Sequence, residues 1–533
     1  MGSLTLFELA DSSSIEIPSS CHRQGFCNEC IVEVQAGLDQ LCDRTPAESF
    51  LKDPYRLACQ ARLLDGAAKQ NLTFAPVRRR PKILTSTCRQ APVCLDPLVR
   101  RQGDTVFYGD QPVDVFRGAM FGIAVDLGTT TIVLDFVNLE TGESVHQVGI
   151  ENPQRFGGSD VMTRISYDAG PHHGRLRKVT VNALNAEIKA FCQAHGADRH
   201  QIYEVIVAGN STMRDLFFGV DIQPIGQRPY QSKIEQEYRL GLRQTTALTE
   251  FAHRLGVLAH PKARVFGPPL VASHVGADTT ADLLAIDIEK REETFLLVDV
   301  GTNTEVVLAH RGRFLAASCP AGPAFEGRGI RFGMPGAEGA IERIWWTSQG
   351  WRYQVIGDVA PQGICGSGLI DLLAELRRNG LMSPKGVFLN RSYEIPIAPE
   401  YGITFSREDA SHLAQAKAAN YCGQFILLRA LGVDPSQIDK LYLAGGFANS
   451  IQVANAVEIG FLAPVPEQRV VKIGNGALEG ARQMLLSQSK RASVERILKR
   501  IEHVELETTP DFFEIFVEAC QFKPMSIPKG TPQ

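Results

Sequence analysis

A repeat within the chain constrains its fold more than any other feature of the sequence. The segment FGIAVDLGTTTIVLDFV at 121–137 matches FLLVDVGTNTEVVLAHR at 295–311, with Asp126 aligned to Asp299. Each copy has an apolar strand, a D-x-G-T turn and a second strand, which predicts a β-hairpin. A second pair follows in the same order, because EVIVAGNSTM and LYLAGGFANS each contain a strand that ends at glycine. The sequence therefore predicts a duplicated α/β unit with a cleft between its halves.

The D-x-G-T turns also indicate what the cleft binds. Glycine lets a backbone approach phosphate closely, amides and threonine hydroxyls donate to phosphate oxygens, and aspartates hold Mg²⁺ mainly through water. A single turn of this kind is equally consistent with a hairpin in which Asp and Gly serve only the backbone geometry. Two turns in register, together with the paired strands, favour a phosphate site.

The duplication resembles the superfamily of acetate kinase, sugar kinases, heat-shock chaperones and actin. That resemblance implies a duplicated actin-like, ribonuclease H-like ATPase domain with two phosphate motifs and an adenosine motif. The two aspartates would hold Mg²⁺ beside ATP and are the catalytic candidates. In chain order, the first phosphate motif, the second and the adenosine motif correspond to Asp126, Gly128, Thr129 and Thr130; to Asp299, Gly301, Thr302 and Asn303; and to Gly445, Gly446 and Phe447.

Other features near the predicted cleft are less specific. The stretch 320–342 is too glycine-rich for a regular element, and a helix is predicted to begin near Ser367 after Gly-Ser-Gly. A helix start of this kind suits either an anion site or an ordinary capped core helix. Glu305, Glu326 and Glu338 lie in or near these loops and are candidates for positioning the attacking water.

The cysteines indicate a second kind of chemistry. Five of the 12 lie between positions 21 and 59, and Cys21, Cys27 and Cys30 have the spacing C-x5-C-x2-C, with Cys59 following in RLACQ. In a reducing compartment such a group suggests metal or redox chemistry before disulfides. Three thiolates on one loop with a distant fourth is how a 2Fe-2S cluster is held, whereas zinc sites usually present two C-x2-C pairs. Iron is favoured over zinc.

The loop and RLACQ resemble the vertebrate-type ferredoxins, which implies an N-terminal β-grasp ferredoxin-like domain with Cys21, Cys27, Cys30 and Cys59 as the cluster ligands. We expect strands over Leu4–Leu9, Ser14–Ile17 and Ile31–Val34. A Rieske-type centre is set aside because it needs two histidines, and only one lies nearby. Cys42 reads as a packed side chain, and Cys88 and Cys94 have no assigned role.

The chain is expected to be an α/β multi-domain protein. We expect a 2Fe-2S domain over 1–75, a Pro- and Arg-rich linker over 76–119, and the two ATPase halves over 120–290 and 291–533. The 55 basic and 59 acidic residues give a net charge of −4, so no basic field exists to track nucleic acid or an anionic membrane. No segment approaches 18 uninterrupted apolar residues and no secretory signal is recognisable, so a cytoplasmic protein is expected.

The combination suggests uphill electron delivery, because neither part alone requires the other. It resembles the reductive activators of corrinoid proteins, and ENPQRFGGSDVMTRI at 151–165, SHVGADTTADLLA at 273–285 and PAGPAFEG at 320–327 look like that family's own segments. Arg164 and Asp160 in the first of these either face the cleft or have buried structural roles. The resemblance implies that ATP drives transfer of one electron from the 2Fe-2S cluster to Co(II) corrinoid, which regenerates Co(I) for methyl transfer.

The implied partner is a corrinoid protein or methyltransferase; the upstream electron donor is not indicated, and a homodimer is one open assembly. Two alternatives stay open. One is an ATP-gated donor to another low-potential enzyme, similar to the activators of hydroxyacyl-CoA dehydratases, although those share a four-iron cluster between subunits. The other is a non-catalytic, nucleotide-dependent redox sensor or chaperone.

Overall fold

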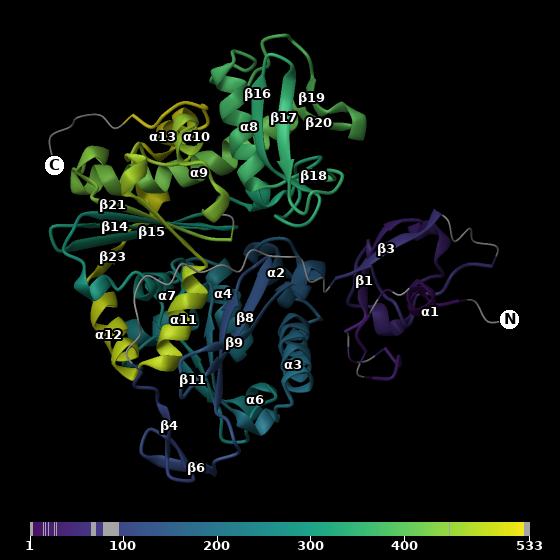
Figure 1. Ribbon diagram of the computed structural model, residues 1–533, viewed down its shortest axis with the longest axis vertical. Coiled ribbons are helices and arrows are strands. Elements are labelled where there is room, and N and C mark those ends of the chain that lie inside the picture. Colours follow the sequence, from purple (N-terminus) through teal and green to yellow (C-terminus); the bar gives the residue numbers. More distant parts are fainter. Residues whose placement is uncertain are drawn as a thin grey trace.

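The computed structural model describes residues 4–13, 15, 17–19, 21–25, 27, 29–65, 71–77, 95–446 and 448–526. A small N-terminal domain lies to one side of two larger lobes that are stacked on each other (Figure 1). Within the described part of the chain, no helix is long and apolar enough to cross a membrane.

The N-terminal domain is built on a three-stranded antiparallel sheet with the order β2-β1-β3, formed by β1 (Ile31–Ala36), β2 (Tyr55–Leu57) and β3 (Thr73–Pro76). The strand predicted at Ile31–Val34 is confirmed as β1. The strand predicted over Leu4–Leu9 is wrong, because these residues enter helix α1 (Leu6–Ser12). Of the strand predicted over Ser14–Ile17, residues 14 and 16 lie outside the described residues, and 15 and 17 belong to no strand.

A capping box explains why α1 is a helix. The Thr5 hydroxyl accepts a hydrogen bond from the Glu8 amide at 3.2 Å, and the Glu8 carboxylate accepts one from the Thr5 amide at 2.8 Å. These two bonds satisfy backbone donors that the first turn of a helix otherwise leaves unpaired. The apolar residues Leu6 and Ala10 then lie on one face and are buried. The capping pattern T-x-x-E therefore outweighs the strand predicted from this short apolar stretch.

The segment predicted as a linker contains more structure than expected. Strands β4 (Val99–Gln102), β5 (Thr105–Tyr108) and β6 (Gln111–Val115) form a three-stranded antiparallel sheet. This sheet is attached to the first lobe, since the Tyr108 hydroxyl donates to the Glu204 carboxylate at 2.9 Å. Cys88 and Cys94 lie outside the described residues.

The predicted duplication is present as two six-stranded sheets with the same central strand order. The first lobe has the order β11-β12-β10-β7-β8-β9 and the second has β22-β21-β13-β14-β15-β23. In each sheet the hairpin that carries the D-x-G-T turn lies next to a parallel strand that ends at glycine, β10 beside β7 and β21 beside β13. The two D-x-G-T turns therefore lie at equivalent edges of the two sheets.

The bounds of these strands follow the sequence pattern. In the first lobe they are β7 (Phe121–Leu127), β8 (Thr131–Asn138), β9 (Ser144–Glu151), β10 (Ile202–Ala208), β11 (Leu248–Phe251) and β12 (Arg264–Gly267). In the second lobe they are β13 (Phe295–Val300), β14 (Thr304–His310), β15 (Arg313–Cys319), β21 (Lys440–Ala444), β22 (Val470–Gly474) and β23 (Ile501–His503). Residues 295–298 of β13 are all fully buried, as expected for a strand that is covered on both faces.

Helices cover both sheets. The first lobe contains α2 (Val161–Asp168), α3 (Arg175–His195), α4 (Ser211–Phe218), α5 (Lys233–Arg239), α6 (Ala252–Leu255) and α7 (Ala277–Ala285). The second contains α8 (Gly366–Arg378), α9 (Arg407–Leu431), α10 (Val453–Glu458) and α13 (Phe512–Ala519), while α11 (Gly476–Leu486) and α12 (Gln488–Leu498) follow β22 in the chain. Its insertion adds β16 (Ala340–Thr347), β17 (Gly350–Val355), β18 (Gly363–Ile364), β19 (Glu394–Ala398) and β20 (Ile403–Ser406). After β22 the chain returns to the first lobe, where α11 packs against α7 and β7.

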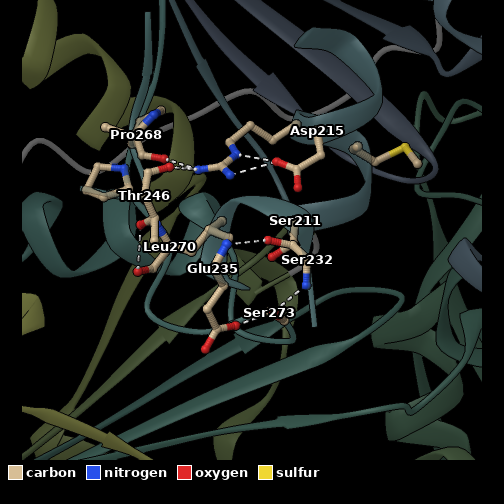
Figure 2. Close-up of polar contacts among 12 residues, drawn as sticks. Ser211, Asp215, Ser232, Glu235, Thr246, Pro268, Leu270 and Ser273 are labelled. Atoms are coloured by element: carbon tan, nitrogen blue, oxygen red, sulfur yellow. Dashed lines mark hydrogen bonds and ion pairs between the residues drawn. The ribbon is translucent and has the colours of Figure 1, made fainter. Parts of the chain in front are cut away.

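A buried polar network supports α4 and the segment that leads into α7 (Figure 2). The fully buried Arg214 donates to the carbonyl oxygens of Thr246 at 2.9 Å and Pro268 at 2.8 Å, and it pairs with the equally buried Asp215 at 2.7 Å. Nearby, the Ser232 amide donates to the Ser273 hydroxyl at 2.7 Å. Buried charges persist when they are paired and hydrogen-bonded. The network thus links helix α4 to the segments that contain Thr246 and Pro268.

Candidate functional site: a nucleotide cleft and a cysteine cluster

A cavity of about 230 Å³ lies between the two lobes. It is lined by residues from both D-x-G-T turns and from the loops that follow β10, β21 and β22. The predicted residues that line it are Asp126, Gly128, Thr129, Thr130, Asp299, Gly301, Thr302, Asn303, Gly445 and Gly446. Phe447 lies outside the described residues. The fold thus brings together side chains that are more than 300 positions apart in the sequence.

The first D-x-G-T turn is held by the segment 151–165. The Asn152 side chain donates to the Gly128 carbonyl at 2.8 Å, and its backbone amide donates to the Thr130 carbonyl at 2.7 Å. Between them, the fully buried Arg164 donates to the Thr129 carbonyl at 2.6 Å. Each of these three carbonyl groups has a hydrogen-bond donor, so the backbone of the turn is held in place. The amides and hydroxyls of the turn therefore keep a fixed orientation. Arg164 therefore has the buried polar role, whereas Asn152 was not found from the sequence.

Two further polar residues shape the same turn. Asn210 precedes α4, where its side-chain oxygen accepts from the Met213 amide at 3.0 Å and caps the helix. Its side-chain nitrogen donates to the Thr129 hydroxyl at 3.0 Å. Asp160 also caps a helix, accepting from the Thr163 amide at 2.9 Å at the start of α2. The role of Asp160 is thus to cap helix α2, whereas Asn210 both caps α4 and lines the cavity.

Partly buried carboxyl groups line the wall of the cavity. Burial raises the pKa of Asp126 to about 7, against a hydrogen bond from the Asn475 side chain at 2.7 Å. Burial also raises the pKa of Asp278 to about 7 and the pKa of Asp299 above its usual range. Behind them lies Asp282, whose pKa is well above the usual range because it is fully buried beside the Asp299 carboxylate. These groups are costly to ionise together without a cation.

No lysine, arginine or histidine lines the cavity among the residues that the structure describes. The acidic lining residues are Asp126, Glu151, Asp278, Asp299, Glu305, Glu326 and Glu342. Phosphate oxygens would meet net negative charge here, so an anionic ligand has to bring a cation with it. Asp278 and Asn475 were not predicted as site residues, although Asp278 lies in the singled-out segment 273–285.

Glu326 bridges the two D-x-G-T turns. It ends the short 3₁₀ helix η8 (Pro323–Glu326), and its carboxylate accepts from the Thr302 hydroxyl at 2.7 Å and from the Thr130 hydroxyl. Glu305 also lines the cavity, where it accepts from the Ser318 hydroxyl at 3.1 Å. Glu338 is not among the lining residues that the structure describes. Positioning of the attacking water by either of the first two stays a prediction.

Gly445 lies in the cavity wall in a backbone conformation that favours glycine. Its φ is +110°, and a Cβ added there would lie 2.1 Å from the Val300 carbonyl oxygen. Gly445→Ala is expected to lower the stability of the second lobe by about 1–3 kcal/mol, because the residue must leave its strained backbone region. The neighbouring Gly446→Ala is the matched control, because no heavy atom lies within 4 Å of its Cβ position. Urea unfolding measures both variants, and equal midpoints would contradict this role of Gly445.

The four predicted cluster cysteines are buried in the N-terminal domain, and the structure brings two of them into contact. Cys21, Cys27, Cys30 and Cys59 are all buried, and the Sγ atoms of Cys30 and Cys59 lie 3.4 Å apart. Backbone and side-chain N–H groups are directed at the sulfurs, from the Glu29 amide to Cys27 and from the Gln60 side chain to Cys59, each at 3.5 Å. Cys42 is only partly buried, and its thiol faces the Leu63 carbonyl at 3.7 Å.

The cysteine arrangement fits a sulfur-ligated group. All four side chains are thiols, the donors that iron-sulfur clusters use, and N–H groups aimed at cysteine sulfur are the second layer around such clusters. Within the described residues, no three His, Cys, Asp or Glu side chains converge on a position for a single metal ion. Gly25 in the cysteine loop has a φ of +85°, and a Cβ there would lie 2.9 Å from the Gln60 amide nitrogen. A side chain at this position would therefore disturb the donor to Cys59.

Three family models match separate parts of this chain. Residues 2–64 match the family described as 2Fe-2S iron-sulfur cluster binding domain, residues 121–291 match RACo middle region, and residues 293–529 match C-terminal domain of RACo the ASKHA domain. The chain thus has a 2Fe-2S domain followed by an ATP-binding domain of the actin-like class.

Individual relatives share the same organisation. The corrinoid activation enzyme RamQ of Eubacterium limosum is 29% identical over 96% of this chain and 95% of its own length. The [Co(II) methylated amine-specific corrinoid protein] reductase of Methanosarcina barkeri is 25% identical over 77% of this chain and 79% of its own. A solved reductive activator for corrinoid, iron-sulfur protein has 27% identity and a TM-score of 0.71, and the match covers 98% of this chain and 96% of that one. The chain belongs to the family of reductive activators of corrinoid proteins.

Proposed function

We propose that this protein is an ATP-dependent reductive activator of a corrinoid protein, which delivers one electron to Co(II) of the partner's corrinoid and so regenerates Co(I) for methyl transfer. The observation that carries the proposal is that one chain contains both four buried cysteines and a cleft of the phosphate-binding type. Its domains follow the order of the matched families. Each catalytic cycle consumes one electron, which an external low-potential reductant has to replace.

Cys21, Cys27, Cys30 and Cys59 would hold the 2Fe-2S cluster, which supplies a one-electron carrier when it is bound. The chain's own residues exclude water from the thiols, because Leu57 and Ala58 beside Cys59 are fully buried. They also orient N–H donors toward two of the sulfurs. Hydrogen bonds and dry surroundings of this kind tune the reduction potential of an iron-sulfur site.

The cleft would bind ATP, and Asp126 and Asp299 would hold its Mg²⁺. Thr130 and Thr302 present hydroxyl donors from the two lobes, and the Glu326 carboxylate accepts from both. A phosphate that takes over these donors would join the lobes in place of Glu326. Gly445, Gly446 and Phe447 are proposed for the adenosine side on the basis of the family motif. The division into residues 1–75, 76–119, 120–290 and 291–533 and the homodimer stay predictions.

Energetics explain why ATP is needed. An acceptor whose potential lies 59 mV below that of the donor loses a factor of ten in the one-electron equilibrium. Nucleotide-dependent closure overcomes this deficit if the closed state binds one state of the corrinoid partner more tightly than the other, because a ligand shifts an equilibrium by its differential affinity.

Mg²⁺ should be required for nucleotide binding and not only for hydrolysis. Among the residues that the structure describes, the cavity lining contains seven carboxyl groups and no basic side chain. We expect the affinity for ATP to fall by about 100-fold or more when Mg²⁺ is chelated, because repulsion between phosphate and carboxylate is then uncompensated. Isothermal titration with ATP in Mg²⁺ or in chelator measures this. Equal affinities would contradict the proposed role of Asp126 and Asp299.

A reconstituted assay tests the function itself. The protein, loaded anaerobically with iron and sulfide, is mixed with a chemical reductant, MgATP and a corrinoid protein encoded near its gene. The cobalt absorption spectrum should then show conversion of Co(II) to Co(I) that depends on ATP. ATP hydrolysis without any cobalt reduction would favour a donor to another low-potential enzyme. Nucleotide-dependent binding to the corrinoid protein without turnover would favour the sensor or chaperone.

A further inference from the structure

The N-terminal domain is docked on the first lobe by a continuous apolar contact. The rings of Phe50 and Phe156 meet edge to face with centroids 5.7 Å apart, and they belong to one buried cluster that includes residues of both domains. Figure 1 shows the N-terminal domain beside α3 of the first lobe. Phe156 belongs to the 3₁₀ helix η4 (Pro153–Gly157), within the same segment that holds the first D-x-G-T turn.

Polar contacts also join the N-terminal domain to the first lobe and fix its orientation. The Tyr167 hydroxyl of α2 donates to the Phe50 carbonyl at 2.7 Å, and the Asn182 side chain of α3 donates to the Cys27 carbonyl at 2.9 Å. Arg155 of η4 pairs with Glu33 of β1 at 3.1 Å. The N-terminal domain therefore contacts the first lobe through its cysteine loop, through β1 and through the loop that precedes β2.

Arg155 stands between the N-terminal domain and the nucleotide cavity. Its guanidinium pairs with Glu33 on one side and with Glu151, which lines the cavity, at 2.6 Å on the other. The Arg155 side chain is only 14% exposed and Glu33 is 20% exposed, so water screens this pair less than a surface ion pair. The next residue after Glu151 is Asn152, which holds the Gly128 and Thr130 carbonyls.

A second chain of contacts runs parallel to the first. The buried Gln154 accepts from Arg164 at 2.9 Å and donates to the Thr180 hydroxyl of α3 at 2.7 Å. Arg164 in turn holds the Thr129 carbonyl, and α3 provides the Asn182 contact to the cysteine loop. All three carbonyls of the phosphate turn are thus held by a segment that also forms the docking surface.

We propose that docking of the N-terminal domain preorganises the first phosphate turn, with Arg155 as a positioning residue, so that nucleotide binding and docking strengthen each other. This inference rests on the nucleotide site of the proposed function and concerns its regulation. A loop that is ordered before its ligand arrives binds with a smaller entropy loss. Since binding couplings are reciprocal, whatever docking adds to the ATP affinity, ATP adds to docking by the same factor. Nucleotide binding in the cleft would thus affect docking of the N-terminal domain through residues 151–165.

Two variants test the coupling from positions outside the cavity. Glu33→Gln removes the ionic partner that Arg155 has in the N-terminal domain. Tyr167→Phe removes one hydrogen bond between the domains, while the ring stays in place against Phe156. Arg155 itself is not substituted, because it also contacts Glu151 in the cavity wall. Asp43→Asn, at an exposed residue of the N-terminal domain, is the control with the same change of charge as Glu33→Gln.

The first measurement is the dissociation constant of MgATP, by calorimetry on full-length, cluster-loaded protein whose visible absorption matches the wild type. Both docking variants should bind MgATP about 3- to 10-fold more weakly, a typical coupling between sites, and the control should bind it as the wild type does. The second is amide hydrogen exchange in residues 45–57, which MgATP should slow in the wild type by a similar factor and not in Tyr167→Phe. Unchanged or tighter MgATP binding in both docking variants would overturn the inference, whereas a wild type that binds no MgATP would instead refute the proposed function.

Discussion

Cys59→Ser is expected to remove the visible absorption of the iron-sulfur cluster and to lower the rate of corrinoid reduction by about 100-fold or more. The serine oxygen is a harder and less readily ionised ligand than a thiolate, so iron is poorly retained. The site is buried and the change is nearly isosteric, so the domain itself should still fold. Absorption spectra and iron content after anaerobic reconstitution measure the loss.

Cys42→Ser is the matched control for this experiment. Cys42 lies in the same domain, but its thiol faces the Leu63 carbonyl, to which a serine hydroxyl also donates. The control should therefore keep the wild-type iron content and absorption. Full iron content in Cys59→Ser would show that the ligand assignment is incorrect.

Asp299→Asn is expected to abolish ATP-stimulated corrinoid reduction, by about 100-fold or more, while the cluster absorption stays unchanged. Asp299 is the penultimate residue of the hairpin strand β13 and lies in the cavity wall, where it would hold Mg²⁺ together with Asp126. An amide keeps the shape of the side chain but removes the charge that attracts the cation. The measurement is the rate of Co(I) formation with and without ATP, and normal ATP stimulation would contradict the proposed role.

The stability of Asp299→Asn separates loss of function from loss of fold. Burial raises the pKa of Asp299, so this carboxyl lowers the stability of the fold progressively as the pH rises from its ordinary pKa to the raised one, and the full cost is present above that. The neutral amide removes this cost, and the thermal midpoint at neutral pH should equal or exceed that of the wild type. Asp439→Asn is the control in the same lobe, because Asp439 is exposed and an amide oxygen can still accept from the Thr294 backbone at the 3.0 Å observed for the carboxylate.

Much of the fold could be predicted from the sequence because it depends on local pattern. The hairpins at 121–137 and 295–311 follow from apolar strands around a D-x-G-T turn, and both are present. The prediction was wrong at residues 4–9, where a capping box starts a helix in a short apolar stretch that was taken for a strand. The three-stranded sheet within 76–119 was not foreseen, because its strands are short and its sequence has no sustained period.

The candidate site was predictable only in part. The residues of the two turns were found from their motif, whereas Asn152, Asp278 and Asn475 were not. Asn475 contacts Asp126 across 349 positions of sequence, and no local pattern marks such a partner. Arg164 was noticed in the sequence, but its contact with the Thr129 carbonyl became visible only in the structure.

The sequence by itself determined the repeated hairpins, the pairing of two lobes and the cysteine spacing, because strand period, turn chemistry and ligand spacing are set by residues close together in the chain. Only the tertiary structure decided which distant groups meet: the carboxyl groups that crowd one cavity wall, Glu326 between the two turns, and Arg155 between Glu33 and Glu151. Those contacts depend on how whole domains pack, and packing is settled by the complementary shapes of surfaces assembled from many segments.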